Sequence, residues 1–226
     1  MNPCHSVAEL QALIAGGAQP RYLMFWGHRP ARDGAIGKAC MSQWFEAAFT
    51  VDGVRYPTAE HYMMAGKARL FGDEEIAHRV VDTAEPGAVK ALGRKIRGFD
   101  EGTWRQHCSA IVEAGNLAKF AQDPRLREFL RGTGERVLVE ASPVDAIWGI
   151  GLAAADPRAA DPAQWPGPNL LGFALMRVRG GAEKRMTSMG ARIGCRGAHG
   201  QEGKRRPLNQ TPRRRANRTI TNRANP

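Results

Sequence analysis

The basic residues of this chain are concentrated in its last fifth, and this uneven charge determines which residues can fold. Residues 181–226 contain 12 Lys and Arg against 2 Glu, and no Phe, Tyr or Trp follows Phe173. A segment with few large apolar residues and one sign of charge cannot bury enough surface to offset the entropy of ordering. We therefore predict that residues 181–226 form a disordered basic tail.

The preceding 180 residues carry 21 Lys and Arg against 20 Asp and Glu, so their charge is nearly balanced. Their composition is ordinary for a globular protein. No apolar run approaches the roughly 20 residues that a membrane-spanning helix needs, and the N-terminus lacks the pattern of a secretory signal. We expect a cytoplasmic protein with no membrane contact, in which the tail makes at most weak, salt-sensitive contact with nucleic acid.

The sequence contains no recognisable metal or phosphate-loop motif. The cysteines are separated by 36, 68 and 87 residues, which matches no metal-binding pattern, and no pair of histidines has H-x-x-x-H spacing. No Gly-rich phosphate loop of a standard form is present. We expect free thiols, no metal and no bound cofactor, and the oligomeric state stays open.

The hydrophobic pattern predicts a mainly helical α+β fold with a small β-sheet. Helices are expected over 7–13, 58–70, 73–81, 86–96, 104–120, 124–130, 142–148 and 170–178. Strands are expected over 22–26 and 137–139 and in a hairpin over 45–56, which turns at Asp52-Gly53. Because strands and helices do not alternate, a doubly wound parallel sheet is disfavoured. We expect an N-terminal extension over 1–20 and one compact domain over 21–180.

The first segment with chemical potential surrounds a predicted helix start at Thr58. If Thr58 is the N-cap, Glu60 lies in the first turn, and Lys67 lies seven residues later on the same face. The two would be roughly 10 Å apart along the helix axis and could flank a charged sugar. The alternative is structural, since a first-turn Glu is favoured by the helix dipole and Lys67 could be solvated.

Three further segments allow a structural and a functional interpretation. Asp145 fits a capping box that begins at Ser142, but with Trp148 and the glycines beside it the segment also fits a pocket wall. Asn169 fits the N-cap of the last helix. Arg94 follows a Gly at a helix end and is either a phosphate ligand or a surface residue.

Taken in order, these segments resemble the YbiA-like family, whose members are also called NADAR domains. The motifs that carry the resemblance are F-W-G-H, C-x-S-Q-W-F, F-x-V-D-G-x-x-Y-P-T-A-E-H-Y-M-M-A-x-K-A, G-R, N-x-A-K-F, L-x-G-T-G, L-V-E-A-S-P-x-D-x-x-W-G-I-G-L and N-L-L-G-x-A-L-M-x-V-R. They span about residues 21–179 and leave the tail without a counterpart.

The resemblance implies a compact domain that hydrolyses N-glycosidic bonds. One branch of the family splits ribose 5-phosphate from an aminopyrimidine intermediate of riboflavin biosynthesis, and another removes ADP-ribose from modified guanine. We expect an N-glycosidase with a small ribosyl-phosphate substrate and no cofactor. The alternatives are an ADP-ribosyl glycohydrolase acting on guanine in nucleic acid and a non-catalytic module that binds NAD or ADP-ribose.

The resemblance also implies roles for particular residues. Of Glu60 and Asp145, one is expected to stabilise the sugar cation and the other to activate water, and which residue has which role stays open. Lys67 is the third catalytic candidate. The expected substrate-binding residues are Arg94, Trp44, Trp148, Asn169 and His61.

Three positions depart from the family pattern. Gly66 stands where many members carry Glu or Gln, and Gln43 and Ile150 differ from the branch that acts on riboflavin intermediates. These differences leave the substrate open.

Overall fold

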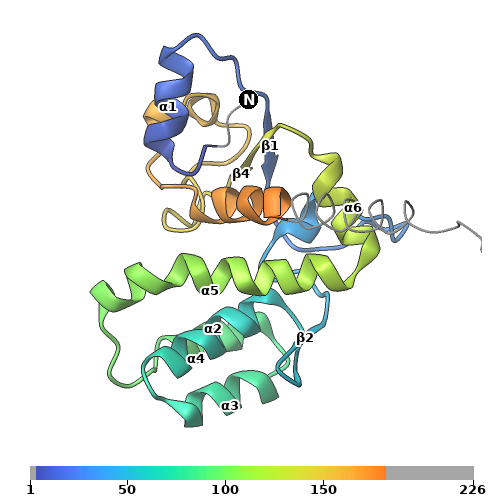
Figure 1. Ribbon diagram of the computed structural model, residues 1–226, viewed down its shortest axis with the longest axis vertical. Coiled ribbons are helices and arrows are strands. Elements are labelled where there is room, and N and C mark those ends of the chain that lie inside the picture. Colours follow the sequence, from blue (N-terminus) through green and yellow to red (C-terminus); the bar gives the residue numbers. More distant parts are fainter. Residues whose placement is uncertain (1–3, 182–226) are drawn as a thin grey trace, which may run out of the picture.

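The computed structural model describes residues 4–181, and almost all of the predicted basic tail lies outside them. The fold is mainly helical with little β-structure, as predicted (Figure 1). The helices are α1 (Val7–Ala15), α2 (Ala59–Leu70), α3 (Glu74–Asp82), α4 (Pro86–Gly93), α5 (Glu101–Gln122), α6 (Pro124–Gly132) and a last helix over 170–181. Short 3-10 helices are η1 (Lys38–Met41), η2 (Pro157–Ala160) and η3 (Pro162–Gln164). Among residues 4–181, no helix is long and apolar enough to cross a membrane.

The strands form two separate pairs rather than one sheet. β1 (Tyr22–Phe25) pairs in parallel with β4 (Val137–Glu140), and β2 (Phe49–Val51) pairs with β3 (Val54–Tyr56) as an antiparallel hairpin. The Asp52-Gly53 turn is confirmed, since both residues have positive φ, 50° and 78°, as the tight hairpin turn requires.

The single small β-sheet expected from the sequence is two separate pairs, and the strand near 137–140 does not join the hairpin, because the free edge of β2 is already occupied. The Gln122 side chain at the end of α5 accepts a hydrogen bond from the Thr50 N–H at 2.9 Å and donates to the Thr50 carbonyl at 2.7 Å. β4 instead pairs with β1, and its first three residues are fully buried, as is typical of a parallel strand covered on both faces.

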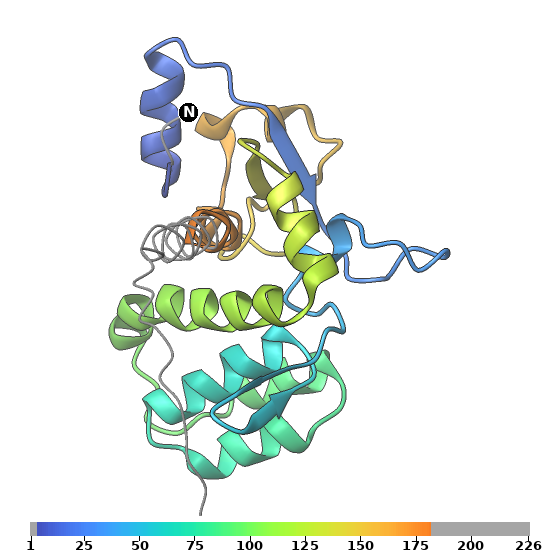
Figure 2. The same ribbon diagram turned by 45° about the vertical axis from the view of Figure 1, so that its right-hand side comes forward.

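Helix α5 crosses the middle of the molecule and separates two halves (Figures 1 and 2). On one side lie α2, α3 and α4, and on the other lie the β1–β4 pair and the last helix. Helix α1 belongs to the second half: Leu10 is fully buried, and the Gln11 side chain donates to the Pro162 carbonyl. The region expected as an N-terminal extension therefore packs onto the domain.

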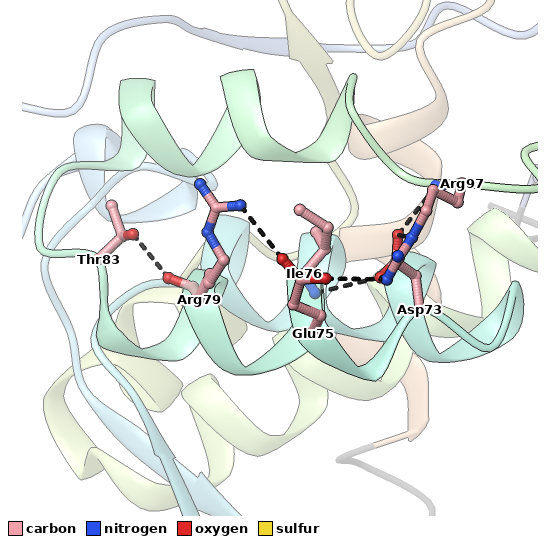
Figure 3. Close-up of polar contacts among 6 residues, drawn as sticks. All are labelled: Asp73, Glu75, Ile76, Arg79, Thr83 and Arg97. Carbon is pink, nitrogen blue, oxygen red and sulfur yellow. Dashed lines mark hydrogen bonds and ion pairs between the residues drawn. The ribbon is translucent and has the colours of Figure 1, made fainter.

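The start of α3 is tied to the segment that follows α4 (Figure 3). Asp73 caps α3 by accepting the Ile76 N–H, and it also accepts the Arg97 backbone N–H at 2.9 Å and the Arg97 guanidinium at 2.7 Å. These hydrogen bonds from Arg97 hold the pKa of Asp73 well below its usual range. The connection fixes where the chain leaves α4, next to Arg94.

The helix expected over 142–148 is wrong. Asp145 Oδ1 accepts the backbone N–H groups of Ile147 and Trp148 at 2.9 and 2.8 Å, so the side chain closes a tight turn. The expected capping box from Ser142 is therefore absent, because the local bonds of Asp145 compete with helix formation.

Candidate active site

A cavity of about 490 Å³ opens where the carboxyl ends of β1 and β4 face helices α2 and α4. This volume suits a small-molecule ligand. The cavity is lined by three carboxylates, three cationic side chains and four of the chain's five tryptophans. These residues are Glu60, Glu140, Asp145, Lys67, Lys90, Arg94, Trp26, Trp44, Trp104 and Trp148.

Glu60 lies in the first turn of α2, as predicted. Thr58 caps the helix by accepting the His61 N–H, and the Glu60 N–H donates to the Gln43 carbonyl at 2.9 Å. Only 2% of Glu60 is exposed, and its Oε1 has no hydrogen-bond partner among the described residues. Burial raises the pKa of Glu60 to about 7, while the positive charge of Lys90 and a hydrogen bond from the Trp44 side chain lower it.

Glu140, which sequence reasoning missed, is the last residue of β4. Its N–H donates to Asn169 Oδ1 at 2.9 Å, and its carbonyl accepts the Ile150 N–H at 2.9 Å, so its backbone is fixed on both sides. The side-chain Oε2 is buried and has no hydrogen-bond partner within residues 4–181. The sequence did contain a signal for Glu140 as a site residue, because it ends an apolar strand. Ligands commonly bind at the carboxyl ends of parallel strands.

The surroundings of Glu140 favour its neutral form. Burial is the main reason that its pKa is raised to about 8, and the negative charges of Asp145 and Glu60 act in the same direction. Lys90 opposes this shift. Two carboxyl groups with raised pKa values therefore line one cavity, a pattern that is common at functional sites.

Asp145 lies in the turn that follows β4 and is paired with a cation. Its Oδ2 is 3.8 Å from Lys90 Nζ, while its Oδ1 is held by the turn described above. Lys90, also missed from the sequence, lies in the last turn of α4, where a lysine is expected for the helix dipole alone. The contact joins α4 to the turn that follows β4.

Lys67 and Arg94 lie along the wall formed by α2 and α4. Lys67 Nζ donates to the Gly93 carbonyl at 3.0 Å and lies 4.1 Å from the centre of the Phe99 ring. Burial lowers the pKa of Lys67. Gly93 allows the two helices to approach closely, because a Cβ there would lie 2.1 Å from Met64 Sδ.

A model of the NADAR domain family matches residues 24–181, the part of the chain that carries this cavity. The chain belongs to the NADAR domain family. An N-glycosidase of Acanthamoeba polyphaga mimivirus is 41% identical over 164 residues, which are 70% of this chain and 95% of that protein. N-glycosidase YbiA of Escherichia coli strain K12 is 31% identical over 129 residues, 57% of this chain and 72% of that protein.

The solution structure of Escherichia coli YbiA has the same fold. It matches with a TM-score of 0.56 and 25% sequence identity, covering 82% of this chain and 94% of that one. The prediction of a single mainly helical YbiA-like domain is therefore confirmed.

Four tryptophans of this NADAR domain surround the cavity from separate parts of the chain. Trp44 and Trp148 line it as predicted, and Trp44 also lies 5.6 Å from the His28 ring, centre to centre. Trp104, at the start of α5, and Trp26, which is 56% exposed at the end of β1, complete the aromatic lining. These rings offer faces on which an aromatic heterocycle can stack.

Two predicted substrate-binding residues do not reach the cavity. His61 is fully buried, and its ring nitrogens bond to Thr58 Oγ1 and to the Thr83 carbonyl, both at 2.8 Å. Asn169 is also buried: it accepts the Glu140 N–H and donates to the Leu138 carbonyl at 2.9 Å. The expected side-chain N-cap at Asn169 is wrong, because this side chain anchors β4 instead of the last helix.

Helix α5 supports the loop that carries Trp44. Lys119 is fully buried, and its Nζ donates to the carbonyls of Cys40 and Ser42 at 2.7 and 2.9 Å. Burial lowers the pKa of Lys119 to about 8. One turn earlier, Asn116 donates to Gln43 Oε1 at 2.8 Å.

Within the described residues, no cluster of three or more His, Cys, Asp or Glu could hold a metal ion. Cys4, Cys40 and Cys108 are free thiols, as predicted. The fourth, Cys195, lies outside the described residues.

Proposed function

We propose that this protein is an N-glycosidase that releases ribose 5-phosphate from ribosyl-phosphate heterocycles such as early intermediates of riboflavin biosynthesis. The observation that carries the proposal is the buried Glu60 carboxyl group, whose Oε1 has no hydrogen-bond partner among residues 4–181, in a cavity rich in tryptophan and cationic side chains. The relatives named N-glycosidases support the same reaction type.

The carboxylates suit the chemistry of a breaking ribosyl C–N bond. As this bond breaks, positive charge develops on the sugar ring, and a carboxylate fixed beside the ring stabilises it. Among residues 4–181 no hydrogen bond holds Glu60 Oε1 elsewhere, and the Glu60 pKa of about 7 suits a general base that activates water near neutral pH. Asp145 contributes a second negative charge, oriented by the turn and by Lys90.

The cationic wall suits the phosphate of the substrate. Lys67, Lys90 and Arg94 all line the cavity from α2, α4 and the residue that follows α4. Arginine binds phosphate through two parallel hydrogen bonds, and lysine adds a compact charge. The tryptophan faces would then hold the heterocycle.

A direct test incubates the full-length protein with the phosphorylated aminopyrimidine riboside and follows ribose 5-phosphate by mass spectrometry. We expect release by the wild type and a loss of roughly 10²–10⁴-fold in kcat for Glu60→Gln, which keeps the shape of the side chain but cannot accept a proton. No release from any ribosyl-phosphate heterocycle would exclude the proposal.

A second candidate, removal of ADP-ribose from guanine, is favoured by the mouth of the cavity. Trp26, Val144 and Ile147 line the cavity and are 56%, 85% and 66% exposed, so apolar surface extends beyond the enclosed volume. A larger substrate could contact this surface. ADP-ribosylated guanosine, assayed in parallel, distinguishes the two activities, and micromolar binding without turnover would indicate a non-catalytic module.

A further inference from the structure

Glu140 has no role in the proposed function, in which Glu60 and Asp145 are the acting carboxyl groups, yet it has three notable properties. It lines the cavity, one of its carboxyl oxygens is buried without a partner among residues 4–181, and its backbone is bonded on both sides. A buried polar atom without a partner is costly in a native structure, so its retention calls for an explanation.

The backbone around Glu140 is arranged to hold this side chain in one place. The Asn169 side chain bridges the end of β4, accepting from Glu140 N–H and donating to Leu138. Gly149 packs against Glu140 so closely that a Cβ at position 149 would lie 2.6 Å from the Glu140 carbonyl and 3.3 Å from its Cγ. This rigidity is what a group that acts on a reacting atom requires.

We propose that Glu140 is a catalytic residue that donates a proton to the leaving nitrogen of the N-glycosidic bond, while Glu60 accepts a proton from the attacking water. The inference rests on the proposed N-glycosidase function and adds a residue to it. Asp145 is less suited to this role, because its Oδ1 already accepts two backbone N–H groups and its Oδ2 faces Lys90.

The step balances without any other reactant than water. The bond between the ribose anomeric carbon and nitrogen breaks, and its electron pair moves to nitrogen, which takes the proton from the Glu140 carboxyl group. Water bonds to the anomeric carbon and gives its proton to the Glu60 carboxylate. The net transfer of one proton from Glu140 to Glu60 is reversed through solvent before the next turnover.

The charged groups facing Glu140 support this division of roles. Asp145, from the following turn, and Glu60, on α2, raise its pKa, and Lys90, on α4, lowers it. The remaining charged or titratable side chains of the cavity are Lys67, Arg94 and His28. Burial raises the pKa of both carboxyl groups, but Lys90 and a hydrogen bond from Trp44 lower that of Glu60, whereas the negative charges of Asp145 and Glu60 raise that of Glu140 further, so these surroundings favour the proton on Glu140. As interacting groups, they titrate as a pair.

The test compares two leaving groups in wild type and Glu140→Gln. The aminopyrimidine of the riboside phosphate is a poor leaving group, because its basic nitrogen must take up a proton as the bond breaks. The nicotinamide of nicotinamide mononucleotide is a good leaving group, because it departs as a neutral base and needs no proton. We expect Glu140→Gln to lose roughly 10²–10⁴-fold in kcat on the first substrate and less than tenfold on the second. Glu60→Gln, which affects water, is expected to impair both.

Two further measurements keep the inference testable if nicotinamide mononucleotide is not cleaved. The fall in kcat of the wild type at alkaline pH should disappear in Glu140→Gln. In the free protein at pH 7, the infrared difference between wild type and Glu140→Gln should contain the carbonyl band of a neutral carboxylic acid.

Equal losses on both substrates, an unchanged alkaline fall, or an ionised Glu140 at pH 7 would each overturn the inference. A wild type that cleaves no ribosyl-phosphate heterocycle would instead overturn the proposed function on which it rests.

Discussion

At the scale of single residues, the buried carboxyl groups that suit this site for chemistry also weaken the fold. Glu140 has a pKa of about 8 in the folded protein, far above the ordinary value of 4.5. The folded protein therefore binds more protons than the unfolded chain between about pH 4.5 and 8. Stability conferred by this group is present at low pH and is lost as the pH rises toward 8.

Glu140→Gln is accordingly expected to be more stable than the wild type at pH 8, by on the order of 2–4 kcal/mol, and to differ little at pH 4.5. Urea denaturation at both pH values measures the difference. Glu128→Gln, at an exposed position on α6, serves as the matched control and should show no such pH dependence. The same stability change at both pH values for Glu140→Gln would contradict the account.

The sequence identified some of these residues and missed others for physical reasons. Glu60 and Asp145 lie in distinctive motifs, and the cavity contains both. Glu140 and Lys90 were missed because a strand-ending Glu and a helix-ending Lys have ordinary structural explanations. His61 was expected in the site from the family resemblance, yet it does not line the cavity as its neighbour Glu60 does, because consecutive helical residues point in different directions.

At the scale of elements, the loop that carries Trp44 depends on α5. The ammonium group of Lys119 donates hydrogen bonds to the carbonyls of Cys40 and Ser42. Lys119→Met fills similar space but removes both hydrogen bonds, so that the Ser42 carbonyl keeps only the Phe45 N–H at 3.3 Å.

We expect Lys119→Met to lower the free energy of unfolding by roughly 1–3 kcal/mol and to reduce kcat through displacement of Trp44. Chemical denaturation and steady-state kinetics measure the two effects. Lys38→Met, at an exposed position on η1, is the control. An unchanged stability would show that the loop does not need these bonds.

The close packing of α2 against α4 at Gly93 is a second feature at the scale of elements. Gly93→Ala places a Cβ 2.1 Å from Met64 Sδ, so Met64 must move within the cavity wall. We expect a loss of roughly 1–3 kcal/mol in stability, as is typical of overpacking, together with a raised KM.

Gly87→Ala on the same helix is the matched control, since its Cβ would meet Trp44 Cη2 at an ordinary 3.6 Å. It should be neutral or stabilise by up to about 1 kcal/mol. Equal changes in stability and KM for Gly93→Ala and Gly87→Ala would contradict the explanation that Gly93 is needed for close packing against Met64.

Element type was predictable where local pattern decides it, and topology was not. Periodicity and turn residues gave the helices of the α2–α6 region and the hairpin at Asp52-Gly53. The pairing of β1 with β4 and the occupied edge of β2 depend on contacts between residues far apart in the chain. The turn at Asp145 was mistaken for a helix because Ser and Asp side chains serve both structures.

At the scale of the whole molecule, the candidate site and the most basic part of the sequence are separate. All residues that line the cavity lie between Trp26 and Trp148, whereas the net positive charge comes almost entirely from residues after 180. Removal of residues 182–226 should therefore leave kcat on the small ribosyl-phosphate substrate within about twofold, because no described site residue is lost.

If the substrate is ADP-ribosylated guanine in nucleic acid, the same truncation should raise KM for the polymer and weaken its dependence on salt. Kinetics on both substrates at low and high salt separate these cases. A loss of small-molecule activity on truncation would contradict the independence of the site.

The central claim is that water breaks a ribosyl C–N bond in the cavity built around Glu60. Hydrolysis of the phosphorylated aminopyrimidine riboside in ¹⁸O-labelled water, followed by mass spectrometry of both products, tests it most directly. The account expects one ¹⁸O atom on ribose 5-phosphate, none on the released heterocycle, and no release by Glu60→Gln above roughly 1% of the wild-type rate. Label in free inorganic phosphate, or full release by Glu60→Gln, would contradict it.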